Sequence, residues 1–319
     1  MPQPCSSSVW MSWPAMREAF VQALTELAAR DDQIMIVNGD LGFGVLNDFI
    51  ERFPSQYVNA GVAEQNMTAV ACGMALTGAR AYTYSIGNFP TLRCLEQLRN
   101  DVCCHAANVT VVAIGGGFSY GQLGMSHFAT EDLAFMRTLP GMTVVAPSDP
   151  WQAYELTMQL YARGGPAYLR IDKGSAGLAA GPVEFGKVRR VREGEHAVIF
   201  ATGAILSEAL AAADLLAGQG IGVRVVDVHT IKPLDVEGIR AAVEGRAHVF
   251  TLEEHVVTGG LGSAVAEVCA EAAMSLKTFR RFGLEDMFPD VVGDQRFLRA
   301  RYGLDAASIA NVIRQILVN

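Results

Sequence analysis

The sequence has no hydrophobic run long enough to cross a membrane. Its longest stretch without Asp, Glu, Lys or Arg covers residues 102–130, and this stretch is interrupted by the glycines 115–117 and by several polar residues. The continuous apolar segment within it is 109–114, which contains a single threonine. A membrane-spanning helix needs about 20 apolar residues, whereas a segment this short is typical of a buried β-strand. We therefore expect no association with a membrane.

Positive charge and cysteine motifs are also scarce. The net charge of the 319 residues is -8, and no run of Lys and Arg is longer than Arg189-Arg190. This balance argues against a nucleic-acid-binding surface. The six cysteines form no CxxC motif and most of them lie in apolar runs. That pattern is typical of buried free thiols and not of a metal site or a disulfide framework.

A secretory signal is missing as well. The first 15 residues contain no Lys or Arg and no apolar core, so we interpret 1–13 as a flexible N-terminal tail. Together with the unpaired thiols, this predicts a cytoplasmic protein. Apolar residues make up 50% of the chain, which excludes a disordered protein and suffices for a large core.

Short apolar segments alternate with helix-like segments in two blocks, 14–173 and 196–319. Between them, 174–195 is rich in Gly, Pro and mixed charge, which is typical of a linker. Nearly continuous apolar strands separated by helices indicate parallel sheets covered on both faces. We therefore expect an α/β protein with two doubly wound domains. The expected strands are 34–37, 81–84, 109–114, 143–145, 167–171, 197–201, 222–228, 249–252 and 275–279.

One acidic residue stands out at the start of an expected helix. In 58–67 (VNAGVAEQNM) a glycine turn is followed by Glu64 in the first helical turn. The helix dipole favours an acid there without any function. The residues that follow, 68–75, are so small and apolar that the helix must pack closely, and a buried carboxylate needs a specific partner. Glu64 is therefore a candidate functional residue.

The segment GVAEQNM at 61–67 resembles the stretch that holds the catalytic glutamate in thiamine-diphosphate enzymes of the transketolase superfamily. Further segments resemble this family in the same order, over about residues 14–319. They are 85–99 (SIGNFPTLRCLEQLR, the cofactor loop and following helix), 121–131 (GQLGMSHFATE, the substrate-channel loop), 167–170 (a strand ending in a phosphate-binding arginine), and 225–235 and 253–262 (two signatures of the C-terminal domain).

The resemblance implies a thiamine pyrimidine-binding domain followed by a transketolase-type C-terminal domain. A full transketolase has an additional N-terminal domain that holds the diphosphate through a metal with a GDG motif. Here Gly39-Asp40-Leu41 instead resembles a turn beside the thiamine ring. The resemblance therefore implies the C-terminal subunit of a split transketolase, without metal ligands of its own. A separate N-terminal, diphosphate-binding subunit is expected to hold Mg²⁺ or Ca²⁺, and the two kinds of chain are expected to form a heterotetramer.

The resemblance also implies residue roles around the cofactor. In the family, a glutamate hydrogen-bonds the cofactor pyrimidine and favours the tautomer that removes the thiazolium proton; Glu64 matches it as the catalytic, cofactor-binding residue. Asp40 and Ile86 match positions beside the cofactor. Phe89 is the nearest candidate for stacking on the pyrimidine, because the family's aromatic positions fall at Gly87 and Pro90. A place in the hydrophobic core is the alternative for Phe89.

Three further residues are implied to bind the substrate. His127 matches a family histidine in the substrate channel that bonds donor hydroxyls or a developing oxyanion. Arg170 and Arg17 match two arginines that bind the substrate phosphate, a role that suits the planar guanidinium. Ordinary ion pairs are the alternative for both arginines. Polar family positions are lost at Gly44 and Leu123, so we expect a shorter, unusual or non-phosphorylated substrate.

The implied activity is a transferase of carbohydrate metabolism that moves a two-carbon ketol unit from a ketose to an aldehyde, acting on small sugars or sugar phosphates. Alternatives are the β subunit of a 2-oxo acid dehydrogenase decarboxylase, two-carbon transfer to a carrier in specialised metabolism, and a binding module without catalysis. Against the β subunit, its typical aromatic pair is replaced by 85–88 (SIGN). A glycine cluster at 258–262 is compatible with anion binding, but a structural turn is the favoured interpretation.

Overall fold

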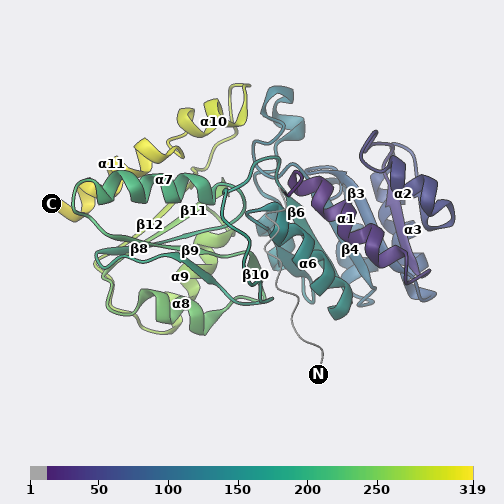
Figure 1. Cartoon of the computed structure of the whole chain (residues 1–319), viewed down its shortest axis with the longest axis horizontal. Coiled ribbons are helices and arrows are strands. Elements are labelled where there is room, and N and C mark those ends of the chain that lie inside the picture. The colour runs from purple at the N-terminus through teal and green to yellow at the C-terminus, as the bar shows by residue number, and fades with distance from the viewer. Residues whose placement is uncertain (1–12, 319) are drawn as a thin grey trace.

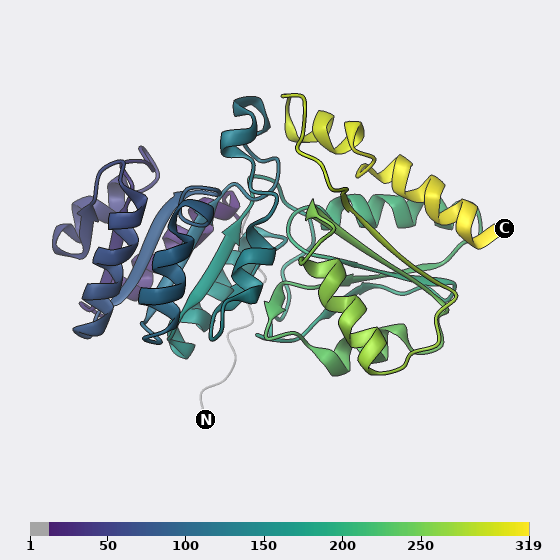
Figure 2. The same cartoon turned by 180° about the vertical axis from the view of Figure 1, so that it is seen from behind.

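The computed structural model describes residues 13–318 as two α/β domains that lie side by side (Figure 1). The tail expected at 1–13 lies outside the described residues except for Trp13. Helices cover both faces of a central sheet in each domain (Figures 1 and 2). The expectation of two doubly wound α/β domains is therefore confirmed. No helix within 13–318 has the length and apolar character needed to span a bilayer.

The first domain is built on a seven-stranded sheet with the order β10-β5-β6-β4-β3-β1-β2. Its neighbours pair in parallel except β10, which runs antiparallel to β5. The strands are β1 (Ile34–Asn38), β2 (Tyr57–Asn59), β3 (Arg80–Ile86), β4 (Val109–Ile114), β5 (Thr143–Val145), β6 (Ala167–Ile171) and β10 (Thr230–Lys232).

Two groups of helices bury the faces of this sheet. One hydrophobic cluster joins the sheet to α1 (Met16–Ala28), α2 (Asn47–Arg52) and α6 (Pro150–Arg163). The opposite cluster joins it to α3 (Glu64–Leu76), α5 (Asp132–Thr138) and an irregular helical segment, 92–103, which contains α4 (Leu95–Gln97). Helix α3 is rich in small apolar side chains on all sides, which lets it pack closely on β1 and β3.

The second domain has a five-stranded sheet with the order β12-β11-β8-β9-β7. Helices α7 (Leu206–Ala217), α10 (Gln295–Arg301) and α11 (Ala306–Val318) share one hydrophobic cluster with it, and α8 (Val236–Val243) and α9 (Leu261–Glu271) share the other. The strands are β7 (Arg189–Arg192), β8 (Ala197–Ala201), β9 (Val223–Asp227), β11 (His248–Val256) and β12 (Thr278–Leu284).

Three details correct the sequence-based expectations. The expected linker 174–195 contains β7, which pairs antiparallel with β9 at the sheet edge. Its sequence, RRVR, has the charge that edge strands carry, so it lacks the apolar signal of a buried strand. Strand β10 lies in the second block of sequence but joins the first sheet, and the last strand begins at Thr278 instead of 275. Among the cysteines, Cys72, Cys94 and Cys269 are buried, whereas Cys104 is exposed.

The order of strands creates a topological switch point at the carboxyl ends of β1 and β3. Strand β2 lies on one side of β1, and β3 lies on the other side. The connections after β1 and β3 therefore lead away from each other at the carboxyl ends of these strands. Ligands of open α/β sheets bind in the crevice that forms at such a switch point.

A buried acidic residue connects the two domains. Asp227, at the end of β9, is fully buried. Its Oδ2 accepts a 2.5 Å hydrogen bond from Gln152 of the first domain and lies 3.6 Å from Nη1 of Arg189. Burial raises the pKa of Asp227 from 3.8 to about 6, although Gln152 and Arg189 oppose this shift. The folded chain therefore holds this proton more tightly than an unfolded chain does.

The raised pKa predicts a pH dependence of stability. Asp227 stabilises the fold below pH about 4, and this contribution of about 3 kcal/mol is lost as the pH rises through 6. We expect the neutral variant Asp227→Asn to flatten the change in unfolding free energy between pH 4 and 7 by about that amount. Urea unfolding at several pH values measures it. The exposed Asp286→Asn variant is the control, and an unchanged slope in Asp227→Asn would refute the assignment.

Candidate functional site

The expected catalytic and cofactor-binding residues gather at the carboxyl edge of the first sheet. Asp40 follows β1, Glu64 opens the helix after β2, Ile86 ends β3, Phe89 follows it, and His127 lies in the long connection after β4. These strands are parallel, so their carboxyl ends share one edge. The structure thus brings residues from four separate sequence segments to the switch point.

Glu64 is a buried carboxylate with one ionic partner. It is 2% exposed, and its Oε2 lies 2.6 Å from Nη1 of Arg93. A Cβ placed on Gly39 would lie 3.5 Å from Cγ of Glu64, so the turn after β1 packs directly against the glutamate. In that turn Asp40 has a positive φ of 57° and accepts a 2.9 Å hydrogen bond from Asn59.

The local sequence explains why Glu64 sits at this end of α3. Gly61 has a φ of 72°, a left-handed conformation that favours glycine, and it turns the chain out of β2. The helix then begins at Glu64 itself, where the dipole favours a negative charge. Thr68, one turn later, donates a 3.0 Å hydrogen bond to the main-chain oxygen of Glu64.

Arg93, which sequence reasoning did not single out, links Glu64 to the aromatic side chains. Its side chain is 47% exposed, and its guanidinium lies 4.5 Å from the centroid of the Phe89 ring. The Phe89 ring in turn meets His127 edge-on, with 5.1 Å between ring centroids. Glu64, Arg93, Phe89 and His127 therefore form one continuous row. The only signal for Arg93 was its place within the segment 85–99.

His127 occupies a short 3-10 turn, Met125–His127. Its Nδ1 lies 2.9 Å from Oγ of Ser126. Burial lowers the pKa of His127 below 6.5, so the imidazole is neutral at pH 7 and is able to accept or donate a hydrogen bond there. The ring centroid lies 6.3 Å from that of Tyr120.

The far end of this row is positively charged. Nζ of Lys173, two residues after β6, lies 3.5 Å from the centroid of the Tyr120 ring. Burial and then the charge of Arg17 lower the pKa of Lys173, so Arg17 and Lys173 act on the same region. Arg17 is ion-paired with Glu18 at 2.8 Å. Sequence reasoning missed Tyr120 and Lys173, which lie just outside the segments that resembled the family.

Arg170 does not lie with these residues on an open surface. It is 1% exposed; its Nε is 2.9 Å from Asp132, and its Nη2 donates to the main-chain oxygens of Ala129 and Glu254 at 3.0 and 2.9 Å. Its guanidinium is thus enclosed by protein groups from both domains. We therefore assign Arg170 to the domain junction instead of the expected contact with a substrate phosphate.

The positions where polar family residues are lost are open. Leu123 is 56% exposed, and no atom lies within 4 Å of a Cβ placed on Gly44. A cavity of about 380 Å³ borders the loop that precedes His127. Its lining consists of Ser119, Tyr120, Gly121, Gln122, Leu123, Lys173, Asp294 and Gln295. Residues of both domains therefore line this cavity, which lies beside the loop that carries His127.

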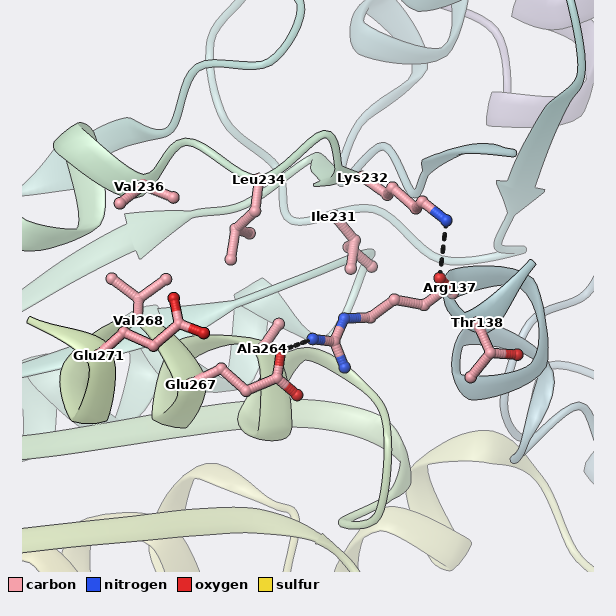
Figure 3. A pocket seen from close by; sticks show the side chains of 10 residues that line it. All are labelled: Arg137, Thr138, Ile231, Lys232, Leu234, Val236, Ala264, Glu267, Val268 and Glu271. Atoms are coloured by element: carbon pink, nitrogen blue, oxygen red, sulfur yellow. Dashed lines mark hydrogen bonds and ion pairs between the residues drawn. The ribbon is translucent and has the colours of Figure 1, made fainter. Parts of the chain in front are cut away.

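A second cavity, of about 430 Å³, lies at another part of the domain junction, between α5, β10 and α9 (Figure 3). In Figure 3 Arg137 reaches across to Glu267, and Lys232 points at the main chain of Arg137. Both cations are thus engaged by protein groups. None of the expected site residues lines this cavity, so we do not take it as the catalytic site.

The glycine cluster at 258–262 forms a structural turn, as favoured from the sequence. The carboxylate of Glu253 accepts hydrogen bonds from the main-chain N–H groups of Leu261 and Gly262, at 2.7 and 2.8 Å. These groups belong to the first turn of α9, where an external anion would otherwise bind. The protein's own buried carboxylate therefore fills that position.

Comparison with known families matches both domains. The transketolase pyrimidine-binding domain family matches residues 13–177, and the transketolase C-terminal domain family matches residues 186–309. Over 320 residues the chain is 36% identical to the 6-deoxy-6-sulfo-D-fructose transketolase subunit of Clostridium sp. (strain MSTE9), covering 99% of this chain and 98% of that one.

Two other relatives differ from each other in the share of their length that this chain covers. The chain is 36% identical to 1-deoxy-D-xylulose-5-phosphate synthase of Syntrophotalea carbinolica over 93% of its own length but 47% of that protein, so it spans about half of this relative. A solved structure described as a split gene transketolase, inactive beta4 tetramer, superposes with a TM-score of 0.84 at 33% identity. The match covers 96% of this chain and 99% of that chain.

The enclosed position of Arg170 predicts that its loss affects stability. Arg170→Met leaves the buried carboxylate of Asp132 without its cation, which costs about 3–5 kcal/mol of unfolding free energy. The exposed Arg99→Met variant is the control and is expected to change stability by less than about 0.5 kcal/mol. Chemical denaturation measures both. A fully stable Arg170→Met variant would contradict the structural assignment.

Proposed function

This chain belongs to the transketolase family, and on that premise we propose that it is the C-terminal subunit of a split transketolase. The proposed reaction is transfer of a two-carbon ketol unit from a ketose donor to an aldehyde acceptor with thiamine diphosphate. The observation that carries the proposal is the row of Glu64, Phe89 and His127 at the switch point of the first sheet.

The residues present fit the pyrimidine end of the cofactor. Glu64 offers a buried carboxyl beside a glycine turn, and Phe89 offers a half-buried aromatic face next to it. A heteroaromatic ring needs a polar group at its edge and an apolar wall along its face. Glu64 and Phe89, with Asp40 and Ile86 at the neighbouring strand ends, are the residues that would hold it. When bound, thiamine diphosphate supplies a nucleophilic thiazolium carbon for the donor carbonyl.

Glu64 has to carry a proton to act on the pyrimidine nitrogen. In this structure Arg93 occupies Oε2 of Glu64 at 2.6 Å, so the pyrimidine ring would take the place of Arg93 there. Arg93 is half exposed and already stacks on Phe89, which gives its cation a place to remain. In this proposal Arg93 is the counter-ion of Glu64 before the cofactor arrives.

His127 and the positive end of the row face the substrate. The neutral imidazole of His127 bonds a donor hydroxyl or the oxygen that becomes negative during C–C cleavage. Arg17 and Lys173 favour an anionic group at the distal end of the sugar. We therefore infer a small ketose that carries a phosphate or sulfonate, in place of the non-phosphorylated substrate that was one of the expectations from Gly44 and Leu123. The sulfo-sugar in the name of the Clostridium relative is consistent with this.

A partner chain is proposed to complete the site. This chain corresponds to about half of the synthase relative, and no group of three or more His, Cys, Asp or Glu side chains within residues 13–318 could hold a metal ion. Apolar side chains also remain exposed beside Glu64 and its partner Arg93 in the sequence, at Val62 and Leu92. We propose that an N-terminal transketolase subunit covers this face, holds the diphosphate through Mg²⁺ or Ca²⁺, and joins this chain in a heterotetramer.

The partner requirement is tested by calorimetry. Thiamine diphosphate with Mg²⁺ is titrated into this chain alone and into its mixture with a candidate N-terminal transketolase chain. We expect binding only in the mixture, because the pyrimidine contacts and the diphosphate contacts would lie on different chains. Tight binding by this chain alone would overturn the split-site proposal.

Glu64→Gln tests the catalytic assignment in the assembled enzyme. The amide keeps the shape of the side chain but cannot carry the proton, so we expect turnover to fall by about 100-fold or more while the subunits still assemble. Glu96→Gln, an exposed glutamate in the following helix, is the matched control. Normal turnover by Glu64→Gln would defeat the assignment.

A second candidate is the synthase activity named for the relative in Syntrophotalea carbinolica, which its identity to this chain favours. The same assay distinguishes the two when ketose and 2-oxo acid donors are offered in parallel. Formation of 1-deoxy-D-xylulose 5-phosphate would favour the synthase, and two-carbon transfer from a ketose would favour the transketolase.

A further inference from the structure

The loop that carries His127 is closed at its base by main-chain hydrogen bonds. We refer to residues 115–129 as the His127 loop. Gly117 and Ala129 form an antiparallel bridge, with N–H to oxygen distances of 2.9 and 3.0 Å. Tyr120 and His127 lie between these two positions. Any group that fixes the base of the loop therefore also fixes where His127 stands relative to Phe89.

One carboxylate of the second domain hydrogen-bonds the closed end of the His127 loop. Glu254, in β11, is 2% exposed. Its Oε1 accepts the main-chain N–H of Phe118 at 2.5 Å and a 2.8 Å hydrogen bond from Gln295. Its Oε2 pairs with the buried guanidinium of Arg299, so the carboxylate has a cation on the side away from the loop. A hydrogen bond from an N–H to a charged acceptor is stronger than a neutral one.

The other side of the base is held through Arg170. Its Nη2 donates to the main-chain oxygens of both Ala129 and Glu254. Two of the three glycines at the start of the loop fit this arrangement, because a Cβ on Gly116 would overlap Arg170 and one on Gly117 would overlap Glu254. The glycines thus leave the room that the two charged side chains occupy.

The second domain also supports the outer part of the loop. The N–H of Gly293 donates to the main-chain oxygen of Gly121 at 3.2 Å, and a Cβ on Gly124 would touch Val292. In Figures 1 and 2 the region after β4 stands beside α10. The second domain thus contacts the loop both at its base and near its tip.

We propose that Glu254 is a positioning residue through which the C-terminal domain sets the geometry of the His127 loop in the first domain. Its side chain acts through the N–H of Phe118 and does not touch the row from Glu64 to His127. The role of His127 in this inference rests on the proposed function, whereas the ordering of the loop by Glu254 does not.

Loop ordering is tested on the chain alone by hydrogen–deuterium exchange. Glu254→Gln keeps the size of the side chain but removes the charge shared with Arg299 and Phe118. We expect exchange within 116–129 to become at least tenfold faster. The control is Glu253→Gln, the adjacent buried glutamate, which bonds the first turn of α9 instead. It should accelerate exchange near Leu261 and leave the His127 loop unchanged.

The assembled enzyme supplies the second measurement. A loosened loop should lower kcat/KM for the donor by about tenfold or more, with a larger change in KM for the donor than in the cofactor affinity, because Glu64 and Phe89 are untouched. Glu253→Gln, at similar burial, should not reproduce this pattern. If Glu254→Gln does not fold, Glu254→Asp decides in the same way, since it keeps the charge for Arg299 but withdraws from the N–H of Phe118.

The outcomes separate the two proposals. Unchanged exchange in the His127 loop of a folded Glu254 variant overturns the positioning role, whatever the activity. If the loop is loosened in the Glu254 variant but the wild-type assembly shows no ketol transfer, the positioning role of Glu254 is supported and the proposed function is overturned. Equal loosening of the loop by Glu253→Gln would also overturn the inference, because the effect would then reflect general destabilisation of the second domain.

Discussion

The buried guanidinium of Arg170 is the constraint on which the arrangement of the two domains depends. A charge that is removed from water needs partners on every side, and Arg170 takes them from Asp132 and Ala129 in one domain and from Glu254 in the other. Burial lowers the pKa of Arg170, but the carboxylates of Asp132 and Asp172 outweigh this and keep it raised. Arg170 thereby holds the two domains in one relative position, and the same contacts fix the base of the loop that carries His127.

In the proposed site, the chemical roles are distributed along one row of side chains. Glu64 supplies a protonatable group at the buried end, and Phe89 forms the aromatic wall in the middle. At the open end, His127 stays neutral because of its burial, while Lys173 contributes positive charge. The cation beside Glu64 is Arg93, whereas Lys173 lies at the opposite end of the row.

The C-terminal domain contributes to this site without supplying a residue of the row. Its strand β11 carries two adjacent buried glutamates with different tasks. Glu253 caps α9 and so stabilises its own domain, whereas Glu254 faces the first domain and bonds Phe118. Successive side chains on a strand point to opposite faces, which is why neighbouring residues of the same type serve two different structures.

The sequence by itself determined most strands and helices and marked Glu64 and His127, because hydrophobic periodicity and short motifs are local properties of the chain. Only the tertiary structure decided which strand ends meet, that Arg93 reaches Glu64, and that Arg170 points into the domain junction. These outcomes depend on crossover connections and on which face of a strand is covered. Phe118 and Glu254, for example, are 136 positions apart, and no local pattern reports a contact over that separation.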